Sequence, residues 1–309
     1  MSPDVAAVIV TYNSAGHIDT CLRSLENLAE IVVVDNGSLD ATCQIARGAR
    51  KGIRLIMNRE NRGFAAAANQ GIAGTASPLV LFVNPDAAIE TGLDPLIEAL
   101  GEPGVGAAAG RLVDDDGRTQ IGFNIRTLPT VASLAFEALL VNRLWPGNPV
   151  NRRYRCLDLD HSLPQDVEQP AGAFLMVRRD VLERAGGWDE RFSPLWFEDV
   201  DLCQRIRRAG YRIRYAPSSV ARHRGAHSLA EISLEQKQIY WYGNLLRYTA
   251  KHFSAPGRMA MRAGVFFGAL LRMVGSVGRG EAGRSYSKVM VLALGRQTAE
   301  AQVQPNVLT

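Results

Sequence analysis

The sequence predicts an α/β protein with a mostly parallel central sheet flanked by helices. Over the first hundred residues, short runs rich in β-branched residues alternate with segments of helical periodicity. Polar, turn-forming residues follow each of the apolar runs. Alternating strands and helices imply crossover connections, and such connections produce a parallel sheet with helices on its faces.

The expected strands of the first half are apolar and short, and they cover Val5 to Val10, Ile31 to Val34 and Leu79 to Val83. Between the first two strands, four apolar residues recur at helical spacing: Ile18, Cys21, Leu22 and Leu25. A Gly/Ser turn after the second strand predicts a further helix with Ser38 as its cap. The segment after Asn61-Arg62-Gly63-Phe64 predicts another helix, which is rich in alanine.

The second half is less regular. Residues 101 to 117 predict a strand and a tight Asp-Asp-Asp-Gly turn, and residues 171 to 177 predict another strand. A short helix is expected from Asp180 to Ala185, ended by Gly186-Gly187, and two late helices are expected from Leu229 to Phe253 and from Met259 to Val274. No element is predicted for the stretch around Trp145-Pro146-Gly147, which lies between the turn that ends at residue 117 and the strand that begins at residue 171.

Composition indicates an ordinary globular protein. The chain has 309 residues, of which 47% are hydrophobic and 21% charged. Its four cysteines lie far apart without a CxxC pair, so neither a zinc site nor a disulfide framework is indicated. The N-terminus lacks the pattern of a signal peptide, and the apolar stretch from Ala263 to Leu271 is too short for a span of roughly 20 residues. We therefore expect a cytoplasmic protein.

The net charge of +4 is modest but unevenly placed. Basic residues outnumber acidic ones at 51–54, 205–224 and 251–296, which favours anionic partners such as phosphates or anionic lipid. No basic stretch interleaved with stacking aromatic residues is present, so we expect no nucleic-acid partner.

Candidate site residues follow the expected strands, because ligands of parallel sheets bind beyond the carboxyl ends of the strands. Three such ends carry polar residues: Thr11-Tyr12-Asn13-Ser14, Asp35-Asn36-Gly37-Ser38 and Asn84-Pro85-Asp86. Asp35 is suited to a ribose or base edge, although an Asp that only stabilises its turn is an equal alternative. The helix opening at Asn61-Arg62-Gly63 suits a diphosphate through its free N–H groups, or is simply a capped alanine-rich helix.

Acidic residues supply the candidate chemistry. Asp86 is the type of oxygen ligand that a divalent ion bridging diphosphate oxygens needs, and the alternative is an Asp in a type I turn. Glu198-Asp199-Val200-Asp201 clusters carboxylates, whose proximity and burial would raise the pKa of a general base. The alternative there is an acidic helix start that is favourable to the helix dipole. One of the two histidines at 223 and 227 could be a metal ligand that joins Asp86, although a histidine in a basic loop is more often a surface or packing residue.

Taken together, these segments resemble the family 2 inverting glycosyltransferases of GT-A fold, especially the bacterial rhamnosyltransferase-like branch. The resemblance covers roughly Val5 to His227 in order and spacing. It is carried by Val8 to Asn13, Val33 to Ser38, Asn61-Arg62-Gly63-Phe64 with Asn69, Asn84-Pro85-Asp86, Gly172-Ala173-Phe174, Gly187-Trp188-Asp189-Glu190 and Phe197 to Leu202. It implies a GT-A domain over 1–228, with a nucleotide-sugar half at 1–115 and an acceptor half at 116–228. A helical extension at 229–309 follows, with a tail expected to be flexible.

The resemblance also implies residue roles. Nucleotide-sugar binding is implied for Thr11, Tyr12, Asn13, Asp35, Asn61, Gly63, Asn69, Asn84 and Asp86. Asp86 matches the last acid of the family's DxD motif and would hold Mg²⁺ or Mn²⁺ with His223; Asn84 stands where the first acid usually lies. Asp199, with Glu198 beside it, matches the catalytic base. Acceptor contacts are implied for Gly172, Trp188 and Asp201.

The implied reaction is transfer of a sugar with inversion at its anomeric carbon, to a glycan or polyprenyl-diphosphate-linked saccharide in cell-envelope polysaccharide synthesis. L-rhamnose from dTDP-rhamnose is the preferred donor, and a UDP-hexose is the alternative. A non-catalytic nucleotide-sugar or carbohydrate-binding protein is a rival class. A Rossmann oxidoreductase is another, but the first turn, residues 11–16, lacks GxGxxG.

The basic, apolar stretch from Met259 to Val274 suggests an interfacial helix that gives peripheral contact with the inner face of the membrane. A helix that packs in the core or in a dimer is an equal alternative.

Overall fold

The computed structural model describes residues 4–49, 52–225, 232–275 and 280–295. The expected C-terminal tail and His227 lie outside these residues. The described chain forms two compact units. Unit 1 comprises residues 1–128, 155–191 and 198–228, and unit 2 comprises residues 129–154, 192–197 and 229–309.

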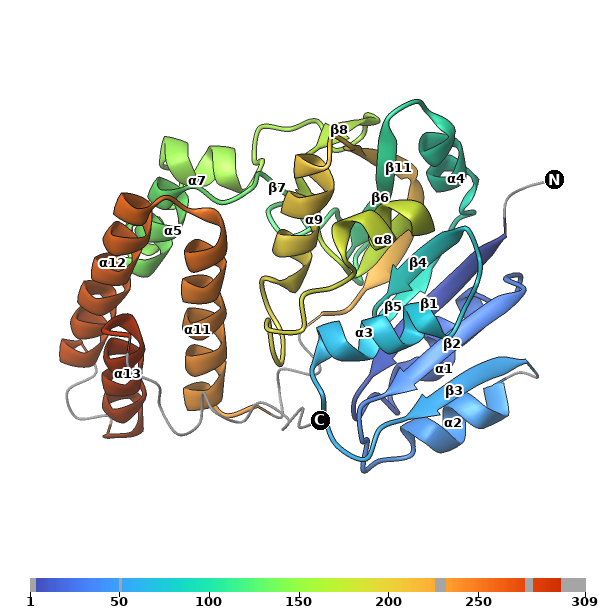
Figure 1. Ribbon diagram of the computed structural model, residues 1–309, viewed down its shortest axis with the longest axis horizontal. Helices are drawn as coiled ribbons and strands as arrows, with labels where there is room; N and C mark the ends of the chain where they lie inside the picture. Colours follow the sequence, from blue (N-terminus) through green and yellow to red (C-terminus); the bar gives the residue numbers. More distant parts are fainter. Residues whose placement is uncertain (1–3, 50–51, 226–231, 276–279, 296–309) are drawn as a thin grey trace. The chain divides into compact units, whose positions relative to one another are not determined.

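Unit 1 begins with the expected alternation of strands and helices (Figure 1). Its first elements are β1 (Val5–Thr11), α1 (Ile18–Ser24), β2 (Glu30–Asp35), α2 (Thr42–Ala49), β3 (Ile53–Met57), α3 (Phe64–Ala73), β4 (Leu79–Val83), β5 (Ala87–Ile89), α4 (Asp94–Gly101) and β6 (Val105–Val113). Later elements of this unit are β7 (Ile125–Arg126), β8 (Gln165–Val167), β9 (Gln169–Pro170), β10 (Phe174–Arg178), α8 (Arg179–Ala185), α9 (Glu198–Arg208) and β11 (Arg212–His223).

The central sheet has the strand order β3-β2-β1-β4-β10-β6-β11-β5, with β8 paired to β11. The strands β1, β2, β3 and β4 run parallel to one another, and so do β6 and β11. However, β10 is antiparallel to both of its neighbours, and β11 is antiparallel to β5 and β8. The sheet is therefore mixed, with parallel order concentrated in the N-terminal half, because β10 enters between β4 and β6 from a later part of the chain.

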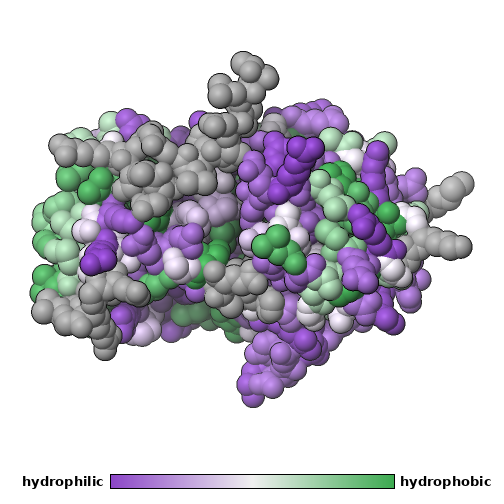
Figure 2. Space-filling model, turned by 90° about the horizontal axis from the view of Figure 1, so that it is seen from below, coloured by the Kyte–Doolittle hydropathy of each residue, from purple (hydrophilic) through white to green (hydrophobic). Residues whose placement is uncertain are grey.

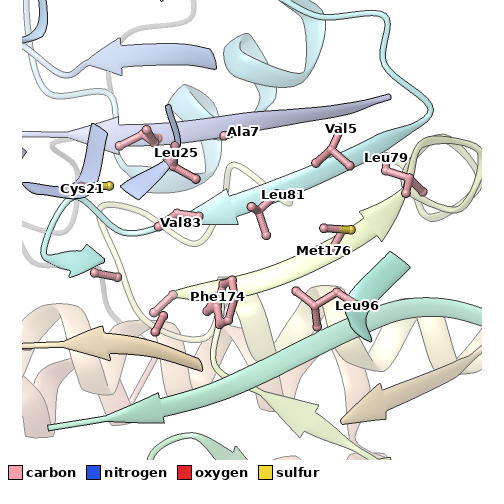
Figure 3. Packing of buried hydrophobic residues seen from close by; sticks show 14 of the residues in the cluster. Val5, Ala7, Cys21, Leu25, Leu79, Leu81, Val83, Leu96, Phe174 and Met176 are labelled. Atoms are coloured by element: carbon pink, nitrogen blue, oxygen red, sulfur yellow. The ribbon is translucent and has the colours of Figure 1, made fainter. Parts of the chain in front are cut away.

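The core of unit 1 forms on both faces of this sheet. On one face, apolar side chains of β1, β4 and β10 meet helices α1 and α4, as Val5, Leu81 and Met176 illustrate (Figure 3). On the other face, Phe82 and Leu175 pack with residues of α8 and α9. The alternation of side chains along each strand sends neighbouring residues to opposite faces, so strands buried on both faces read as continuous apolar runs.

Unit 2 is helical in the part of the chain that the structure describes. Its elements are α5 (Val131–Ala138), α6 (Val141–Leu144), α7 (Pro149–Tyr154), α11 (Leu234–His252), α12 (Ala255–Val274) and α13 (Gly280–Ala293). Capping boxes at Thr130 and Ser233 fix the starts of α5 and α11. In α12, Gly268 lies so close to α5 that an added Cβ would meet the carbonyl of Ala138. None of the described helices is long and apolar enough to cross a membrane.

Candidate active site

The ends of β1 and β2 are tied together by a network of turn hydrogen bonds. The backbone N–H of Asn13 donates to Ser38 Oγ at 2.8 Å, and Leu39 N–H donates to Asn13 Oδ1 at 2.8 Å. Ser38 N–H donates to Asp35 Oδ2 at 2.9 Å, and the Ser38 hydroxyl donates to Asp35 Oδ1 at 2.5 Å. The expectation that Ser38 caps a helix is wrong, because α2 begins at Thr42. Ser38 instead holds the turn between the two strand ends.

The predicted nucleotide-binding residues of this edge are mostly buried. Asp35 is 2% exposed and both of its oxygens accept hydrogen bonds from its own turn, as the turn-stabilising alternative predicts. Thr11 is 1% exposed, and its hydroxyl has no hydrogen-bond partner among the described residues. Tyr12 is half-buried beside it.

The start of α3 lies beside the same edge. The side chain of Asn36 donates to the carbonyl of Gly63 at 3.1 Å, and Asn61 Oδ1 accepts from Gly63 N–H at 2.9 Å. Gly63 is the N-cap of α3 at φ 82°, where a side chain would be strained, and it leaves the first helical turn without a side-chain cap. Further along α3, the amide of Asn69 donates to the carbonyl of Trp188 and accepts from its N–H, both at 2.9 Å. Asn69 thus holds the loop at Trp188 with its whole amide group.

Asp86 follows β4 and lies next to His223, which comes from the far end of β11. His223 Nε2 is 3.5 Å from Asp86 Oδ1, and the two side chains are 4% and 11% exposed. The pairing of β11 with β5 fixes this contact, because His223 lies opposite Ala87 and Arg224 N–H donates to the carbonyl of Asp86 at 3.1 Å. The expected basic loop around His223 is therefore the end of a strand.

Gln120 sets the orientation of the His223 ring. Gln120 Nε2 donates to the carbonyl of His223 at 2.6 Å, which leaves Gln120 Oε1 facing His223 Nδ1 at 3.0 Å. Since Oε1 only accepts, Nδ1 carries the proton, and in the neutral ring the lone pair lies on Nε2, which faces Asp86. Burial lowers the pKa of His223, and the smaller effect of Asp86 opposes this, so the neutral form is favoured.

Asp86 and His223 fit a divalent cation by their chemistry. Two acceptor atoms that face each other across 3.5 Å would repel without a positive charge near them. Among the described residues no group of three or more histidine, cysteine or acidic side chains could hold a metal ion. A two-residue set suits a cation that takes its remaining ligands from phosphate oxygens and water, as Mg²⁺ usually does.

Asp199 lies at the start of α9 with its carboxylate directed at the loop before β10. Asp199 Oδ2 accepts from Gly172 N–H and from Gln169 Nε2, each at 3.3 Å, and Oδ1 accepts from Val200 N–H at 2.7 Å. Burial raises the pKa of Asp199, while these backbone hydrogen bonds and the positive charge of Arg126 act in the opposite direction. Burial and the neighbouring Asp199 also raise the pKa of Glu198, whose buried Oε2 has no hydrogen-bond partner among the described residues.

The two acids lie at one edge of the sheet. Asn84 N–H donates to the carbonyl of Ala173 at 3.1 Å, and the preceding residue, Gly172, donates to Asp199. The end of β4, which leads to Asp86, is thus one residue away from the backbone that holds Asp199. The antiparallel pairing of β10 with β4 produces this arrangement of residues that are more than a hundred positions apart in sequence.

Two of the three predicted acceptor residues, Trp188 and Asp201, are buried. Trp188 is 1% exposed, and its ring packs edge-on against Phe64 and Phe82 at 5.0 Å. Asp201 is fully buried and forms a 2.7 Å ion pair with Arg205. Both side chains belong to the core beneath the site, and their acceptor roles remain predictions. Gly172 does lie beside Asp199, and an added Cβ would be 3.3 Å from Asp199 Cβ.

Three further residues near the acids were not predicted from sequence: Gln120, Phe123 and Arg126. The ring of Phe123 is stacked on His223 at 5.3 Å, and Arg126 Cζ lies 6.0 Å from the centroid of Phe123. Arg126 also pairs with Gln169 in the small β7-β9 sheet, and Gln169 contacts Asp199. No periodic pattern in the sequence marks this stretch, so only the fold brings it to the site.

Comparison with known proteins identifies the family of the chain. A model of the family described as "Glycosyl transferase family 2" matches residues 6–186, and one described as "Glycosyl transferase family group 2" matches residues 156–294. The chain is 30% identical over 303 residues to an N-acetylglucosaminyl-diphospho-decaprenol L-rhamnosyltransferase of Mycobacterium tuberculosis, covering 88% of this chain and 95% of the relative. It is 26% identical to a pre-mycofactocin glycosyltransferase of the same organism, covering 96% of this chain and 58% of the relative.

Solved structures with a similar fold include a mannosyltransferase from Pyrobaculum calidifontis in complex with GDP-Man and Mn²⁺. It matches with a TM-score of 0.54 at 20% identity, covering 97% of this chain and 78% of that chain. GalNAc-T7 with UDP, GalNAc and Mn²⁺ matches with a TM-score of 0.57 at 14% identity, covering 80% of this chain and 48% of that chain.

Proposed function

Because the chain belongs to glycosyl transferase family 2 and is a glycosyltransferase of GT-A fold, we propose that it transfers a sugar from a nucleoside diphosphate to a lipid-linked saccharide, with inversion at the anomeric carbon. One observation carries this proposal. Asp86, paired with His223, and Asp199, held by Gly172, meet at the same edge of the sheet through the neighbouring residues Ala173 and Gly172.

Asp199 is the proposed general base. Its raised pKa makes the carboxylate a better proton acceptor than an exposed aspartate, while the hydrogen bonds from Gly172 and Val200 keep it oriented. It would remove the proton from the acceptor hydroxyl as that oxygen attacks the anomeric carbon and the bond to the nucleoside diphosphate breaks. The pKa of Glu198 is also raised. When Glu198 is protonated, it places no second negative charge beside Asp199.

Asp86 and His223 are the proposed ligands of Mg²⁺ or Mn²⁺. Such an ion, when bound, neutralises negative charge on the diphosphate leaving group. His223 suits this role because burial lowers its pKa, which favours the neutral ring, and because its Nε2 faces Asp86. The structures of GalNAc-T7 and of the Pyrobaculum calidifontis mannosyltransferase were solved with Mn²⁺, which supports a divalent ion for this chain as well.

For the donor we propose dTDP-L-rhamnose, with a UDP-hexose as the alternative, on the strength of the rhamnosyltransferase relative. The edge formed by Thr11, Tyr12, Asn13 and Asp35 would hold the nucleoside, and Asn61, Gly63 and Asn84 would lie nearer the diphosphate and sugar. Asn69 would contribute indirectly, by fixing the loop at Trp188 against α3.

For the acceptor we propose a diphosphopolyprenol-linked saccharide used in cell-envelope glycan synthesis, again by likeness to that relative. A lipid-linked acceptor requires the enzyme to work at a membrane surface. Residues of α12 offer an apolar face for this contact, with Met259, Phe267, Leu271 and Val274 each more than half exposed. Figure 2 shows hydrophobic residues on one face of the molecule.

The proposal is tested in two stages with the full chain. Thermal-shift measurements with dTDP-L-rhamnose, UDP-glucose and UDP-N-acetylglucosamine, each with and without Mn²⁺, identify the donor as the compound that stabilises the protein most. The chosen donor is then incubated with an N-acetylglucosaminyl diphosphate that carries a short polyprenyl chain, and the product linkage is read by NMR.

Asp199→Asn separates binding from chemistry in this assay. It should keep donor affinity within about twofold and lose transfer by roughly 10² to 10⁴, the usual contribution of a general base. Transfer at the wild-type rate by this variant would remove Asp199 from the role. Binding of donor without any transfer by the wild-type chain would favour the non-catalytic alternative.

A further inference from the structure

The segment from Gln120 to Arg126 links the two halves of the site. At one end, Gln120 and Phe123 contact His223 by hydrogen bonds and by ring stacking. At the other end, Arg126 pairs with Gln169, whose amide donates to Asp199 at 3.3 Å. The segment therefore contacts both the metal-ligand candidate His223 and the glutamine that donates to Asp199.

Two apolar side chains of the segment are exposed to solvent, although the neighbouring His223 is buried. Phe123 is 40% exposed although its ring is stacked on the buried His223, and Ile121 is 52% exposed. Gly122 between them has a φ of 78°, which lets the chain turn and display both neighbours. Sites that bind small molecules are lined mainly by apolar and aromatic side chains, together with a few polar groups.

Arg126 adds a positive charge at the base end of the segment. Its guanidinium Cζ lies 6.0 Å from the centroid of Phe123, and Arg126 Nε donates to the carbonyl of Gly122 at 2.7 Å. These contacts hold the guanidinium in place, and a guanidinium is well suited to phosphate oxygens, which it can bind in a bidentate manner.

We propose that Ile121, Phe123 and Arg126 form the acceptor subsite, and that it takes a sugar whose anomeric carbon bears a diphosphate. Phe123 and Ile121 contact the apolar face of the sugar, and Arg126 contacts the diphosphate. This inference rests on the proposed transferase function and names the residues that read the acceptor. It goes beyond the sequence resemblance, which implied acceptor contacts for Gly172, Trp188 and Asp201.

Arg126 could instead act only through its electrostatic effect on Asp199, and the experiment must distinguish this role from recognition of a diphosphate. Arg126 also favours the ionised form of Asp199, and removal of its charge would alter the base for every acceptor alike. Recognition of a diphosphate, by contrast, matters only for acceptors that carry one. The two roles are therefore separated by comparing a charged acceptor with a neutral one.

The experiment uses N-acetylglucosamine linked to a farnesyl chain either through a diphosphate or directly through a neutral glycosidic bond. The values of kcat/KM for both acceptors, and their Kd by calorimetry, are measured for the wild-type chain, Arg126→Ala and Arg126→Lys. Arg118→Ala is the matched control, because Arg118 lies in the same connection, is exposed and pairs with Asp116.

We expect the wild-type chain to prefer the diphosphate acceptor and Arg126→Ala to reduce that preference by about tenfold or more, as loss of a hydrogen bond to a charged group implies. Arg126→Lys should recover part of the preference, and Arg118→Ala should leave it unchanged. Phe123→Ala should weaken binding of both acceptors without a change in donor Kd.

Four results overturn the inference. An equal loss on both acceptors would assign Arg126 to the base alone, and a changed donor Kd would assign it to the donor. A wild-type preference that Arg126→Ala retains would remove the subsite while leaving the proposed function intact. A wild-type chain that transfers sugar but shows no preference would contradict the proposed acceptor class itself, and with it the subsite.

Discussion

At the scale of single residues, the pKa of Asp199 governs when the site can work. Burial raises this pKa above the usual value for aspartate, and the positive charge of Arg126 limits the rise. Only the ionised carboxylate can accept a proton, so activity should fall as the pH drops through the raised pKa. We expect the acid limb of kcat/KM to lie above the ordinary range for an aspartate, and Arg126→Ala to move it to higher pH. A profile that stays flat down to the ordinary range would contradict this expectation.

Gln120 is expected to act on the metal site without touching the metal. Because its amide fixes the proton of His223 on Nδ1, Gln120→Leu frees the ring to rotate or to change tautomer. Loss of such an outer partner commonly weakens metal binding by about 10- to 100-fold. Binding of Mn²⁺, followed by electron paramagnetic resonance in the presence of a nucleoside diphosphate, should show this loss.

The control for Gln120→Leu is Gln165→Leu, which removes a glutamine whose side-chain amide donates to the nearby backbone carbonyls of Asp160 and Leu163. The control should bind Mn²⁺ as the wild-type chain does. Equal Mn²⁺ affinity for Gln120→Leu and the control would show that Gln120 does not orient the ring of His223 for metal binding.

Sequence and structure give different information about individual site residues. Asp86 and Asp199 could be singled out because each follows a recognisable apolar run or motif. Gln120, Phe123 and Arg126 could not, because they lie in a stretch without periodicity and reach the site only when β7 pairs with β9 and β11 pairs with β5. Trp188 was assigned to the acceptor because its motif was recognised, but a motif does not reveal that the side chain is buried.

At the scale of elements, long apolar runs predicted strands well and interrupted ones did not. The predicted strand at Leu79 to Val83 has the same bounds as β4, and the short helix near 180–185 ends at Gly186 in the left-handed conformation. The strand β11 was not predicted, because Pro217 falls in its middle and the register with β6 shifts between Tyr215 and Val220. The two-residue strands β7 and β9 are too short to leave any periodic signal.

Asn69 connects α3 to the loop that follows α8, and its substitution should destabilise this connection. In Asn69→Ala, the N–H and carbonyl of Trp188 lose their partners, and Gly187 loses the side chain that packs against it. Loss of a hydrogen-bond partner inside the protein costs about 1–3 kcal/mol. Urea denaturation should show a free energy of unfolding lower by about this amount.

Gln70→Ala is the matched control on the same helix, because the side chain of Gln70 exchanges hydrogen bonds with the side chain of Asn58. It should be less destabilising than Asn69→Ala. If Asn69→Ala instead left stability unchanged and weakened donor binding, the direct donor contact implied by the family resemblance would be the better assignment.

At the scale of the whole molecule, the sequence predicted the order of elements better than their neighbours in the sheet. The alternation of strands and helices identified the parallel half, but the insertion of β10 between β4 and β6 depends on contacts between residues distant in sequence. Residues 129–154 belong to unit 2 together with the C-terminal helices, and no local sequence pattern predicted this grouping. Such grouping depends on which apolar faces fit together, and the faces are known only once the helices are placed.

The exposed apolar face of α12 predicts that the whole chain associates with membranes. One face of this helix, with Met261, Val265 and Ala269, is buried, while Phe267 and Leu271 are 55% and 54% exposed at a spacing of one helical turn. Full burial of such side chains contributes about 1.5–3 kcal/mol each. We therefore expect Phe267→Glu with Leu271→Glu to reduce flotation with anionic liposomes by at least about tenfold, while transfer to a short-chain acceptor in detergent is retained.

Leu163→Glu is the control for this double variant, since Leu163 is equally exposed, at 55%, but belongs to unit 1. Its flotation should match that of the wild-type chain, so that added negative charge alone is excluded as the cause of any loss. Wild-type protein that remains with the soluble fraction in the presence of anionic liposomes would contradict the membrane contact. Equal losses for the control and the double variant would show that charge, rather than the apolar face of α12, determines binding.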